Sequence, residues 1–587
     1  MPRTQLPSPS RSAEPSQPPP GSGTLPDPRT LDRARLSRDP RFDGRFFMAV
    51  TTTGIYCRPV CPAAPTAKRA NIRYFPTAAA AAEAGFRPCL RCRPEAAPGT
   101  PAWLGTSAVV QRALRLIQDG ALDETSIEQF ASRVGIGARH LHRLFVRHVG
   151  ASANAVAQTR RLQFAKRLID QTNLTMTSIA LAAGYGSLRR FNDVFRAAYG
   201  RPPREIRRGS TASSASRSSS PSRSSPYNGR GQSAEHGDQA VSLRLAYRPP
   251  YDWKSVSDFL SARAIPGVER ADARGYARTI ALPGTEPAAV SATISVRPLP
   301  DRHELELTVS GAPPGALFQI STTARRMFDL AADPALTARV LGSDPVLRGL
   351  LRRRPGLRIP GIWDPFECAV RAVLGQQVSV AAARTLAARV VARAGRPLAP
   401  ATERPVDGLT YLFPSPAELA QADLSGLGVT GSRIAAIQTL ARAVLDGTVD
   451  FSASPEEVID ALKALPGFGA WTAQYIAMRA LGDPDALPAA DIVLRRRAAA
   501  GEHPFTPKEL EVRAEAWRPW RSYAVIHLWR AAGEKARVAS PRATPRAASR
   551  ATPRATSPGA ADSAAESQQR SFDPAPSREN LIEGPTP

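Results

Sequence analysis

The chain contains few cysteines, few lysines and no long hydrophobic run. No run of about 18 or more apolar residues occurs, so we expect no membrane span. The N-terminus reads Met1-Pro2-Arg3-Thr4-Gln5 and continues into a Ser/Pro tract without an apolar core, so we expect no secretory signal. Only five cysteines occur among 587 residues, and four of them lie in two close pairs. Paired cysteines of this kind fit a reducing, cytoplasmic compartment.

The scarcity of lysine accompanies a large excess of arginine. Six of the 78 basic residues are Lys and 72 are Arg, and with 51 acidic residues the net charge is +27. Such an excess favours a polyanionic partner, with nucleic acid first and a membrane surface as the weaker alternative. We therefore expect a cytoplasmic, nucleoid-associated protein that binds double-stranded DNA. We do not expect it to bind a membrane.

Composition divides the chain into two folded halves. The length predicts about four domains of roughly 150 residues each. Residues 1–28 are rich in Pro and Ser, residues 208–240 form a Ser/Arg/Gly linker, and residues 538–587 repeat Ala-Thr-Pro-Arg-like units. These three segments are predicted to be disordered or flexible. The folded halves are 29–207 and 241–537.

The four paired cysteines have the spacing of metal ligands. Cys57 and Cys61 form one pair, Cys89 and Cys92 form the other, and 27 residues separate the pairs. Four thiolates suit Zn²⁺ best. Around them the sequence places a set of basic residues, which we call the basic rim: Arg58, Lys68, Arg69, Arg87, Arg91 and Arg93.

A four-cysteine zinc site is most often purely structural, because a module of this size needs such a staple. A functional interpretation requires one reactive thiolate. Zinc keeps its sulfur ligands deprotonated at neutral pH, so an exposed one stays nucleophilic. Its natural electrophile on DNA is the alkyl group of a phosphotriester, which has lost the negative charge that would repel a thiolate.

A helix-turn-helix pattern follows and is repeated. Gly135 and Gly184, 49 residues apart, each lie between two short amphipathic helices. Each second helix carries basic residues on one face. One such match is weak evidence, but two copies favour DNA binding. The candidate DNA-contacting residues are Arg139, His140, Arg143, Arg189 and Arg190.

The first half resembles the Ada family. Residues 42–47, 52–61 and 84–92 look like its N-terminal zinc domain, and the tandem helices look like its AraC-type DNA-binding domain. The resemblance implies that Cys57 accepts a methyl group irreversibly from a methylphosphotriester, while three cysteines complete the zinc shell. It also implies a switch: methylation removes about one negative charge and so reduces repulsion from the DNA backbone. Promoter binding would then activate repair genes through RNA polymerase.

One feature of full-length Ada is missing from this sequence. That family has a second methyltransferase domain with a Pro-Cys-His site, and no such tripeptide occurs here. The fifth cysteine, Cys368, lies in an apolar helical segment and is interpreted as a core residue. Repair of O6-alkylguanine is therefore not expected.

The second half begins with strands and continues with helices. Residues 241–245 and 302–309 alternate between apolar and polar, which predicts strands of a small sheet. The pattern is helical from about residue 320. A hairpin, Leu465-Pro466-Gly467-Phe468-Gly469, precedes another helix and can present backbone N–H groups to a phosphate. Asp491 follows 22 residues after Gly469 and could either cap a helix or act in catalysis.

This hairpin and Asp491 resemble the helix-hairpin-helix glycosylases, and residues 247–253, 375–379 and 517–524 resemble AlkA. The resemblance implies that Asp491 stabilises positive charge on the sugar while an alkylated base, flipped out of the stack, leaves. It assigns Trp471, Tyr475 and Trp529 to the base pocket, Gln377 to the wedge, Gly467 and Gly469 to DNA binding, and a monovalent cation to hairpin 465–469. Bifunctional relatives have Lys where this chain has Trp471, so a monofunctional hydrolase is implied.

The prediction is a mainly α, multidomain fusion protein. Its parts are an α+β zinc domain (29–97), an all-α tandem helix-turn-helix domain (103–207), an α+β AlkA N-terminal-type domain (241–318) and an all-α helix-hairpin-helix domain (319–537). The predicted activities are suicidal methyl transfer to Cys57 and glycosylase release of bases such as 3-methyladenine. The alternative is a non-enzymatic regulator with a structural zinc and an inactive glycosylase-like clamp.

Overall fold

The computed structural model describes residues 25–63, 67–98, 108–118, 120–207, 240–282, 291–398, 408–499 and 503–539. The predicted linker lies outside the described residues apart from Ala240, as do most of the two predicted disordered ends. Two predicted boundaries differ from the structure. Helix α1 already begins at Pro28, capped by the Asp27 carboxylate, and the last helix ends at Ala539. Everything described below up to Ala536 belongs to one compact unit.

The cysteine region contains a four-stranded sheet in the order β3-β1-β2-β4. Its elements are α1 (Pro28–Ser37), β1 (Phe47–Val50), β2 (Ile55–Cys57), β3 (Ile72–Phe75), α2 (Ala78–Glu83) and β4 (Arg87–Pro88). The Thr77 side chain caps α2, whose alanines pack against Phe47 and Phe75. A small apolar core therefore lies on one side of the sheet, and the cysteines belong to a separate buried cluster.

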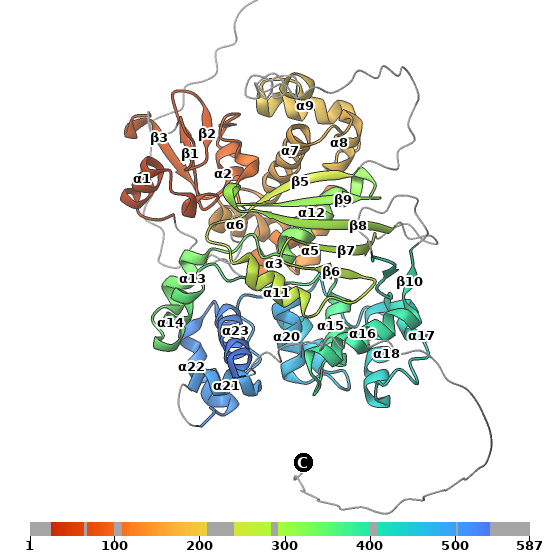
Figure 1. The fold of residues 1–587 in the computed structure, drawn as a ribbon. Helices are drawn as coiled ribbons and strands as arrows, with labels where there is room; N and C mark the ends of the chain where they lie inside the picture. The colour runs from red at the N-terminus through yellow and green to blue at the C-terminus, as the bar shows by residue number, and fades with distance from the viewer. Residues whose placement is uncertain are drawn as a thin grey trace, which may run out of the picture. The chain divides into compact units, whose positions relative to one another are not determined.

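The predicted tandem helix-turn-helix repeat is present. Its helices are α3 (Ala108–Gln118), α4 (Ala121–Glu124), α5 (Ile127–Val134), α6 (Ala138–Val149), α7 (Ala153–Gln171), α8 (Met176–Ala182) and α9 (Leu188–Tyr199). Gly135 ends α5 with φ +85°, and Gly184 separates α8 from α9 with φ +78°. These left-handed conformations favour glycine, which is why the repeat is readable in the sequence. Helix α7 connects the two units (Figure 1).

The second half opens with a five-stranded antiparallel sheet in the order β5-β9-β8-β7-β6. Its strands are β5 (Val241–Ala246), β6 (Glu269–Ala271), β7 (Tyr276–Ala281), β8 (Ser291–Leu299) and β9 (Glu304–Ser310), with helices α11 (Trp253–Ser261) and α12 (Leu317–Met327). Both predicted strand segments are confirmed. Leu243 and Leu245 are buried in a core that includes α12, while Ser242 and Arg244 alternate with them along β5 and are more exposed.

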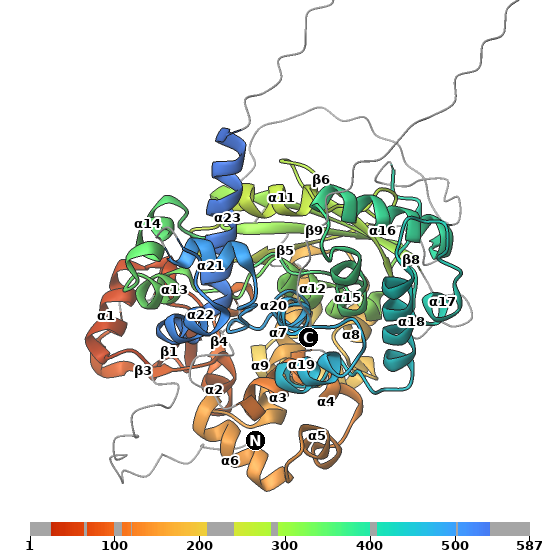
Figure 2. The ribbon, with the colours of Figure 1, turned by 90° about the horizontal axis from the view of Figure 1, so that it is seen from below.

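The remainder is helical and has one large apolar core. Its helices are α13 (Pro334–Leu341), α14 (Pro345–Arg353), α15 (Pro365–Leu374), α16 (Val380–Ala394), α17 (Pro416–Gln421), α18 (Gly431–Leu445), α19 (Pro455–Lys463), α20 (Ala470–Ala480), α21 (Ile492–Ala499), α22 (Pro507–Ala514) and α23 (Arg521–Ala539). A short ribbon, β10 (Arg396–Pro397) with β11 (Tyr411–Leu412), interrupts them. Helices α16, α17 and α18 lie together in both views (Figures 1 and 2). Cys368 is 1% exposed in this core, as predicted.

The two halves are in contact at several places, including an ion pair between Arg112 of α3 and Glu457 of α19 at 3.2 Å, and we call two larger contact regions joints. At the first joint, the second helix-turn-helix unit shares an apolar core with the five-stranded sheet and α12, and the rings of Phe164 and Phe318 lie 4.9 Å apart. At the second, Arg45 of the cysteine region pairs with Asp333, and Arg248 donates to the Asp43 carbonyl at 3.0 Å. One joint is apolar and the other is charged.

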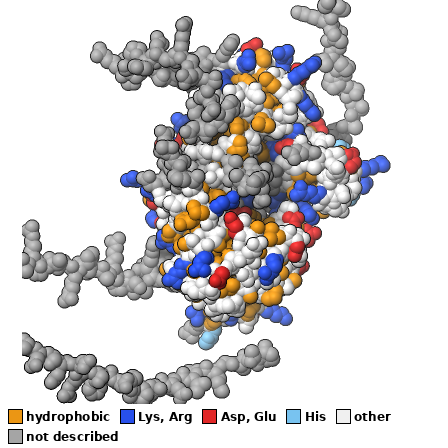
Figure 3. Space-filling view, turned by 90° about the vertical axis from the view of Figure 1, so that its right-hand side faces the viewer, with side chains coloured by type: hydrophobic (Ala, Val, Ile, Leu, Met, Phe, Trp, Pro, Cys, Tyr) orange, Lys and Arg blue, Asp and Glu red, His pale blue; other side chains and the backbone are white. Residues whose placement is uncertain are grey.

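Two further observations concern the molecular surface. On the face shown in Figure 3, basic side chains lie among acidic and apolar ones, so the net charge does not form a single basic field there. Among the helices of the described residues, none is long and apolar enough to cross a membrane.

Candidate metal centre and candidate active site

Strand pairing brings the two cysteine pairs together. Strands β2 and β4 pair in parallel, with Tyr56 opposite Pro88. Parallel strands end at the same edge, so Cys57 at the end of β2 and Cys89 just after β4 lie side by side. A tight turn follows β2, in which Cys61 donates its N–H to the Arg58 carbonyl at 3.1 Å. This turn brings Cys61 back toward Cys57.

The four cysteines are buried, with exposures of 6%, 0%, 9% and 7% for Cys57, Cys61, Cys89 and Cys92, and their Sγ atoms all lie within 4.8 Å of one another. Tetrahedral zinc at about 2.3 Å from each sulfur requires sulfurs about 3.8 Å apart. The contact with Cys61 raises the pKa of the Cys57 thiol, and the reverse contact lowers the pKa of Cys61 to about 7. Four thiolates this close need a cation, and the donor set fits zinc.

Three of the six residues of the basic rim form ion pairs with acidic side chains. Arg58 pairs with Asp43 and donates to the Cys92 carbonyl at 3.1 Å. Arg69 pairs with an aspartate of α1, and Arg93 pairs with Asp170 and Glu95. The other three rim residues are exposed and form no ion pair among the described residues: Lys68, Arg87 and Arg91. The sequence could not show most of this neutralisation, because every one of these acids except Glu95 comes from a distant segment.

The candidate DNA-contacting residues of the tandem repeat lie on α6 and α9. Arg139, His140 and Arg143 are exposed on α6, where Arg143 contacts the His140 ring at 3.3 Å. Arg189 and Arg190 are exposed on α9. The opposite faces of both helices are buried, so each helix presents its basic face outward.

The predicted hairpin joins α19 to α20. Gly467 has φ +88°, and a Cβ there would approach the Ala436 Cβ to 2.8 Å, so glycine is required on two grounds. Gly469 is exposed and begins α20 without a side-chain cap, so the first N–H groups of that helix are open to a ligand. The Gly467 carbonyl accepts from Gln376 Nε2 at 2.8 Å. The monovalent cation expected here stays a prediction.

Asp491 caps a helix, and its second oxygen contacts a predicted pocket residue; its catalytic role stays a prediction. Its Oδ1 accepts from the Leu494 N–H at 2.9 Å and so caps α21. Its Oδ2 accepts from Trp471 Nε1 at 3.0 Å. The side chain is half-buried. One carboxylate oxygen therefore serves the helix, and the other lies beside the predicted base pocket.

The three predicted pocket aromatics are brought together. The rings of Trp471 and Tyr475 stack at 5.2 Å with an interplanar angle of 9°, and Trp529 lies 6.2 Å from Tyr475. All three are half-buried. Arg479, which the sequence reasoning missed, donates to the Tyr475 hydroxyl at 2.5 Å and is 5% exposed. Its spacing of four residues from Tyr475 on one helix was the available signal.

Gln377, the predicted wedge, lies in the loop between α15 and α16. It is exposed and has φ +53°, a strained conformation for a residue other than glycine. Its neighbour Gln376 is anchored: besides its bond to the hairpin, its carbonyl accepts from Arg433. The loop thus holds Gln376 against the hairpin and leaves the Gln377 side chain at the surface.

Family models match four consecutive segments of the chain. Residues 30–95 match the metal binding domain of Ada, and residues 130–209 match a helix-turn-helix domain. Residues 242–364 match the AlkA N-terminal domain, and residues 370–522 match the HhH-GPD superfamily of base excision DNA repair proteins.

Three curated relatives show how these segments combine. A probable bifunctional transcriptional activator/DNA repair enzyme AlkA of Mycobacterium tuberculosis is 42% identical over 499 residues, 85% of this chain and 95% of the relative. DNA-3-methyladenine glycosylase 2 of Escherichia coli is 37% identical over 49% of this chain and 97% of its own length. The bifunctional transcriptional activator/DNA repair enzyme Ada of Escherichia coli is 38% identical over 26% of this chain and 40% of its own length.

Proposed function

The chain belongs to the family of bifunctional transcriptional activator/DNA repair AlkA proteins, and from this premise we propose that it both senses and repairs alkylated DNA. Its second half is a DNA glycosylase of the 3-methyladenine type. Its first half is a zinc domain that accepts methyl groups, followed by a transcription-activating DNA-binding domain. DNA is the shared partner, and the protein works on the nucleoid in the cytoplasm.

The glycosylase proposal rests on the contact between Asp491 and Trp471. Flipping places the alkylated base against the stacked rings of Trp471 and Tyr475, where its cationic ring is attracted to the aromatic faces. As the N-glycosidic bond breaks, positive charge develops on the sugar. Asp491 stabilises that charge and orients the attacking water, while the Trp471 N–H fixes the position of its carboxylate.

Asp491→Asn tests this role while retaining the helix cap, because Asn caps helices as well as Asp does. We expect release of 3-methyladenine from alkylated duplex to fall by about 10²–10³-fold, the usual cost of losing one preorganised electrostatic group. The melting temperature should stay unchanged. Asp446→Asn is the matched control, since Asp446 is an exposed turn residue that accepts from the Thr448 N–H. Equal background release from wild type and Asp491→Asn would instead favour the inactive clamp.

The methyl-acceptor proposal assigns the nucleophile to Cys57. Its sulfur attacks the methyl carbon of a methylphosphotriester, a carbon–sulfur bond forms, and the carbon–oxygen bond breaks with the phosphodiester anion as leaving group. Zinc, when bound by Cys57, Cys61, Cys89 and Cys92, keeps the attacking sulfur deprotonated. The product is a thioether that no longer carries the thiolate charge, so transfer occurs once per molecule.

The loss of one negative charge couples this reaction to promoter binding. The zinc site lies near exposed rim cations, and a less negative site repels the DNA backbone less. In the proposed switch, the methylated zinc domain and the basic faces of α6 and α9 hold promoter DNA, where RNA polymerase is recruited.

Transfer of labelled methyl from phosphotriester DNA, followed by peptide mapping, tests the assignment to Cys57. We expect one methyl group on the peptide containing Cys57 and none elsewhere. Cys57→Ala should abolish labelling, whereas Cys368→Ala, which changes a buried core thiol, should leave it intact. Labelling that persists in Cys57→Ala, or that maps to Cys61, Cys89 or Cys92, would assign the nucleophile to another residue.

A further inference from the structure

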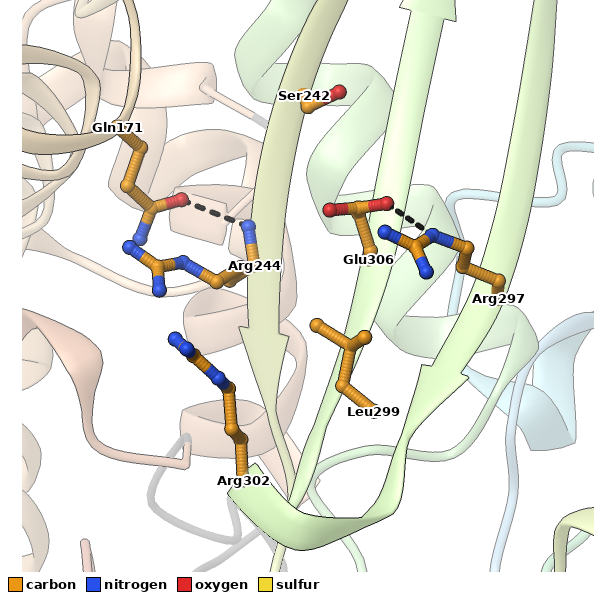
Figure 4. A pocket seen from close by; sticks show the side chains of 7 residues that line it. All are labelled: Gln171, Ser242, Arg244, Arg297, Leu299, Arg302 and Glu306. Atoms are coloured by element: carbon orange, nitrogen blue, oxygen red, sulfur yellow. Dashed lines mark hydrogen bonds and ion pairs between the residues drawn. The ribbon is translucent and has the colours of Figure 1, made fainter. Parts of the chain in front are cut away.

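A cleft of about 360 Å³ lies on the polar face of the five-stranded sheet, away from both proposed reaction sites. Strands β5, β8 and β9 and the turn between β8 and β9 form most of its lining, and the last residue of α7 completes it. The side chains that decide its chemistry are Gln171, Arg244, Arg297, Arg302 and Glu306 (Figure 4).

The cleft contains three guanidinium groups and one carboxylate. Glu306 of β9 lies opposite Arg244 of β5 in one direction and opposite Arg297 of β8 in the other. It pairs with Arg297. Among the described residues, the guanidinium groups of Arg244 and Arg302 have no carboxylate partner. The cleft therefore keeps two uncompensated positive charges.

Gln171 adds hydrogen-bond donors to the cleft. Its Oε1 accepts from the backbone N–H of Arg244 at 2.7 Å, so the end of α7 satisfies an amide of the edge strand β5. Because the oxygen is occupied in this way, the amide NH₂ remains as the donor end of the side chain. In Figure 4 this nitrogen and the guanidinium groups of Arg244 and Arg302 lie along the same side of the cleft.

We propose that this cleft binds a phosphate group. Two guanidinium groups directed into one cleft repel each other unless an anion lies between them. Their planar arrays of N–H donors match the oxygens of a tetrahedral phosphate, which can accept from both at once. A phosphodiester of the DNA backbone and a free phosphate or pyrophosphate present the same oxygens, so both are possible sources of the ligand.

Two measurements on the full chain test the cleft and distinguish the sources. Isothermal titration with inorganic phosphate and with pyrophosphate detects a free ligand. Affinity for undamaged duplex DNA, measured across a salt series, detects a backbone contact. The variant is Arg244→Gln combined with Arg302→Gln. Its matched control removes two exposed arginines elsewhere: Arg339→Gln with Arg352→Gln. Base release measured with saturating DNA should stay unchanged in both, since none of these residues is in the glycosylase pocket and saturation removes any effect of DNA affinity.

A free-phosphate site gives saturable binding in wild type that weakens at least about tenfold in the Arg244/Arg302 variant, with an unchanged salt slope for DNA. A DNA-backbone site gives no such titration, but the slope of log affinity against log salt becomes shallower by about 1–2 in that variant and not in the control. Glu306→Gln should strengthen binding in either case, because it removes the only carboxylate of the cleft. No change in either measurement, or equal changes in the control, would overturn the proposal.

Discussion

The two proposed reactive groups, the Cys57 thiolate and the Asp491 carboxylate, differ in burial and in the groups that contact them. Cys57 is 6% exposed and lies among three other sulfurs, and Asp43 and Arg58 pair beside it. Asp491 is half-buried, and N–H groups of Leu494 and Trp471 hold its two oxygens. In the proposed transfer the acceptor reacts once, so it does not need to release a product from its sulfur. The glycosylase has to admit and release bases, and its site is correspondingly more open.

The packing around the two groups also differs: a small cluster rich in cysteine surrounds Cys57, and a large apolar core lies beside Asp491. The buried cluster around the acceptor consists of the four cysteines with Met48 and Ile72, so its cohesion depends on the metal. Asp491 lies beside a single large apolar core that extends over most of the helical region. A small module with only a small apolar core needs a metal staple, whereas a large helical domain does not. Metal removal should therefore affect the two regions very differently.

The largest effect should come from zinc removal. Structural zinc contributes about 10–16 kcal/mol of apparent binding free energy in small zinc modules, so chelation should unfold the cysteine region and abolish methyl transfer. Base release should persist, because no cysteine of the site belongs to the glycosylase core. Release and methyl transfer measured on one preparation, before chelation, after chelation and after zinc is restored, check this. Loss of both activities on chelation would show that the two regions fold as one.

The charged joint between the halves should give the next largest effect. Arg45 and Asp333 are 11% and 1% exposed, so Arg45→Ala leaves a buried carboxylate whose remaining cation, Arg248, is 4.0 Å away, and it should cost about 1–3 kcal/mol of unfolding free energy. The control is Arg41→Ala, which breaks a pair whose Arg is 62% exposed and should cost at most about 1 kcal/mol. Chemical denaturation of the full chain measures both. Equal losses would mean that this joint contributes nothing specific.

These contrasts show what sequence alone could predict. The cysteine frame, the hairpin at Gly467 and the two helix-turn-helix glycines are local features, because ligand spacing and positive φ are properties of short segments. The partners of those features were not predictable. Asp43 neutralises Arg58 across the cysteine region, and Gln376 reaches the hairpin from the loop between α15 and α16. Such contacts depend on how distant segments pack, which one sequence does not reveal.

The position of Asp491 after the hairpin did not decide between a helix cap and a catalytic carboxylate. A helix cap and a catalytic carboxylate require the same residue type at the same position. The structure shows the cap at Oδ1 and a contact with Trp471 at Oδ2, and the catalytic role stays a proposal. The boundary predicted at residue 28 falls on the first residue of α1, which Asp27 caps.

Trp471→Phe would isolate the hydrogen bond that positions the carboxylate. Phe retains an aromatic ring against Tyr475 but lacks the indole N–H that Asp491 accepts. A hydrogen bond to a charged group is worth about 1.5–3 kcal/mol, so base release should fall by about 10–100-fold if the bond acts in the transition state. Methyl transfer should not change. Single-turnover release separates this effect from binding, and a change in affinity alone would limit Trp471 to base stacking.

Gln377→Ala should have the smallest effect and distinguishes the two reactions most directly. Excision requires the base to leave the stack, and a side chain that fills the gap makes flipping easier. Methyl transfer occurs on the backbone and requires no flipping. Gln377→Ala should therefore slow base release from a fully paired duplex by about threefold to tenfold, slow it less where the damaged base is mismatched, since flipping then costs less, and leave methyl transfer unchanged. Equal slowing on paired and mismatched substrates would remove Gln377 from the wedge role, and its φ of +53° would then reflect only the loop that anchors Gln376 to the hairpin.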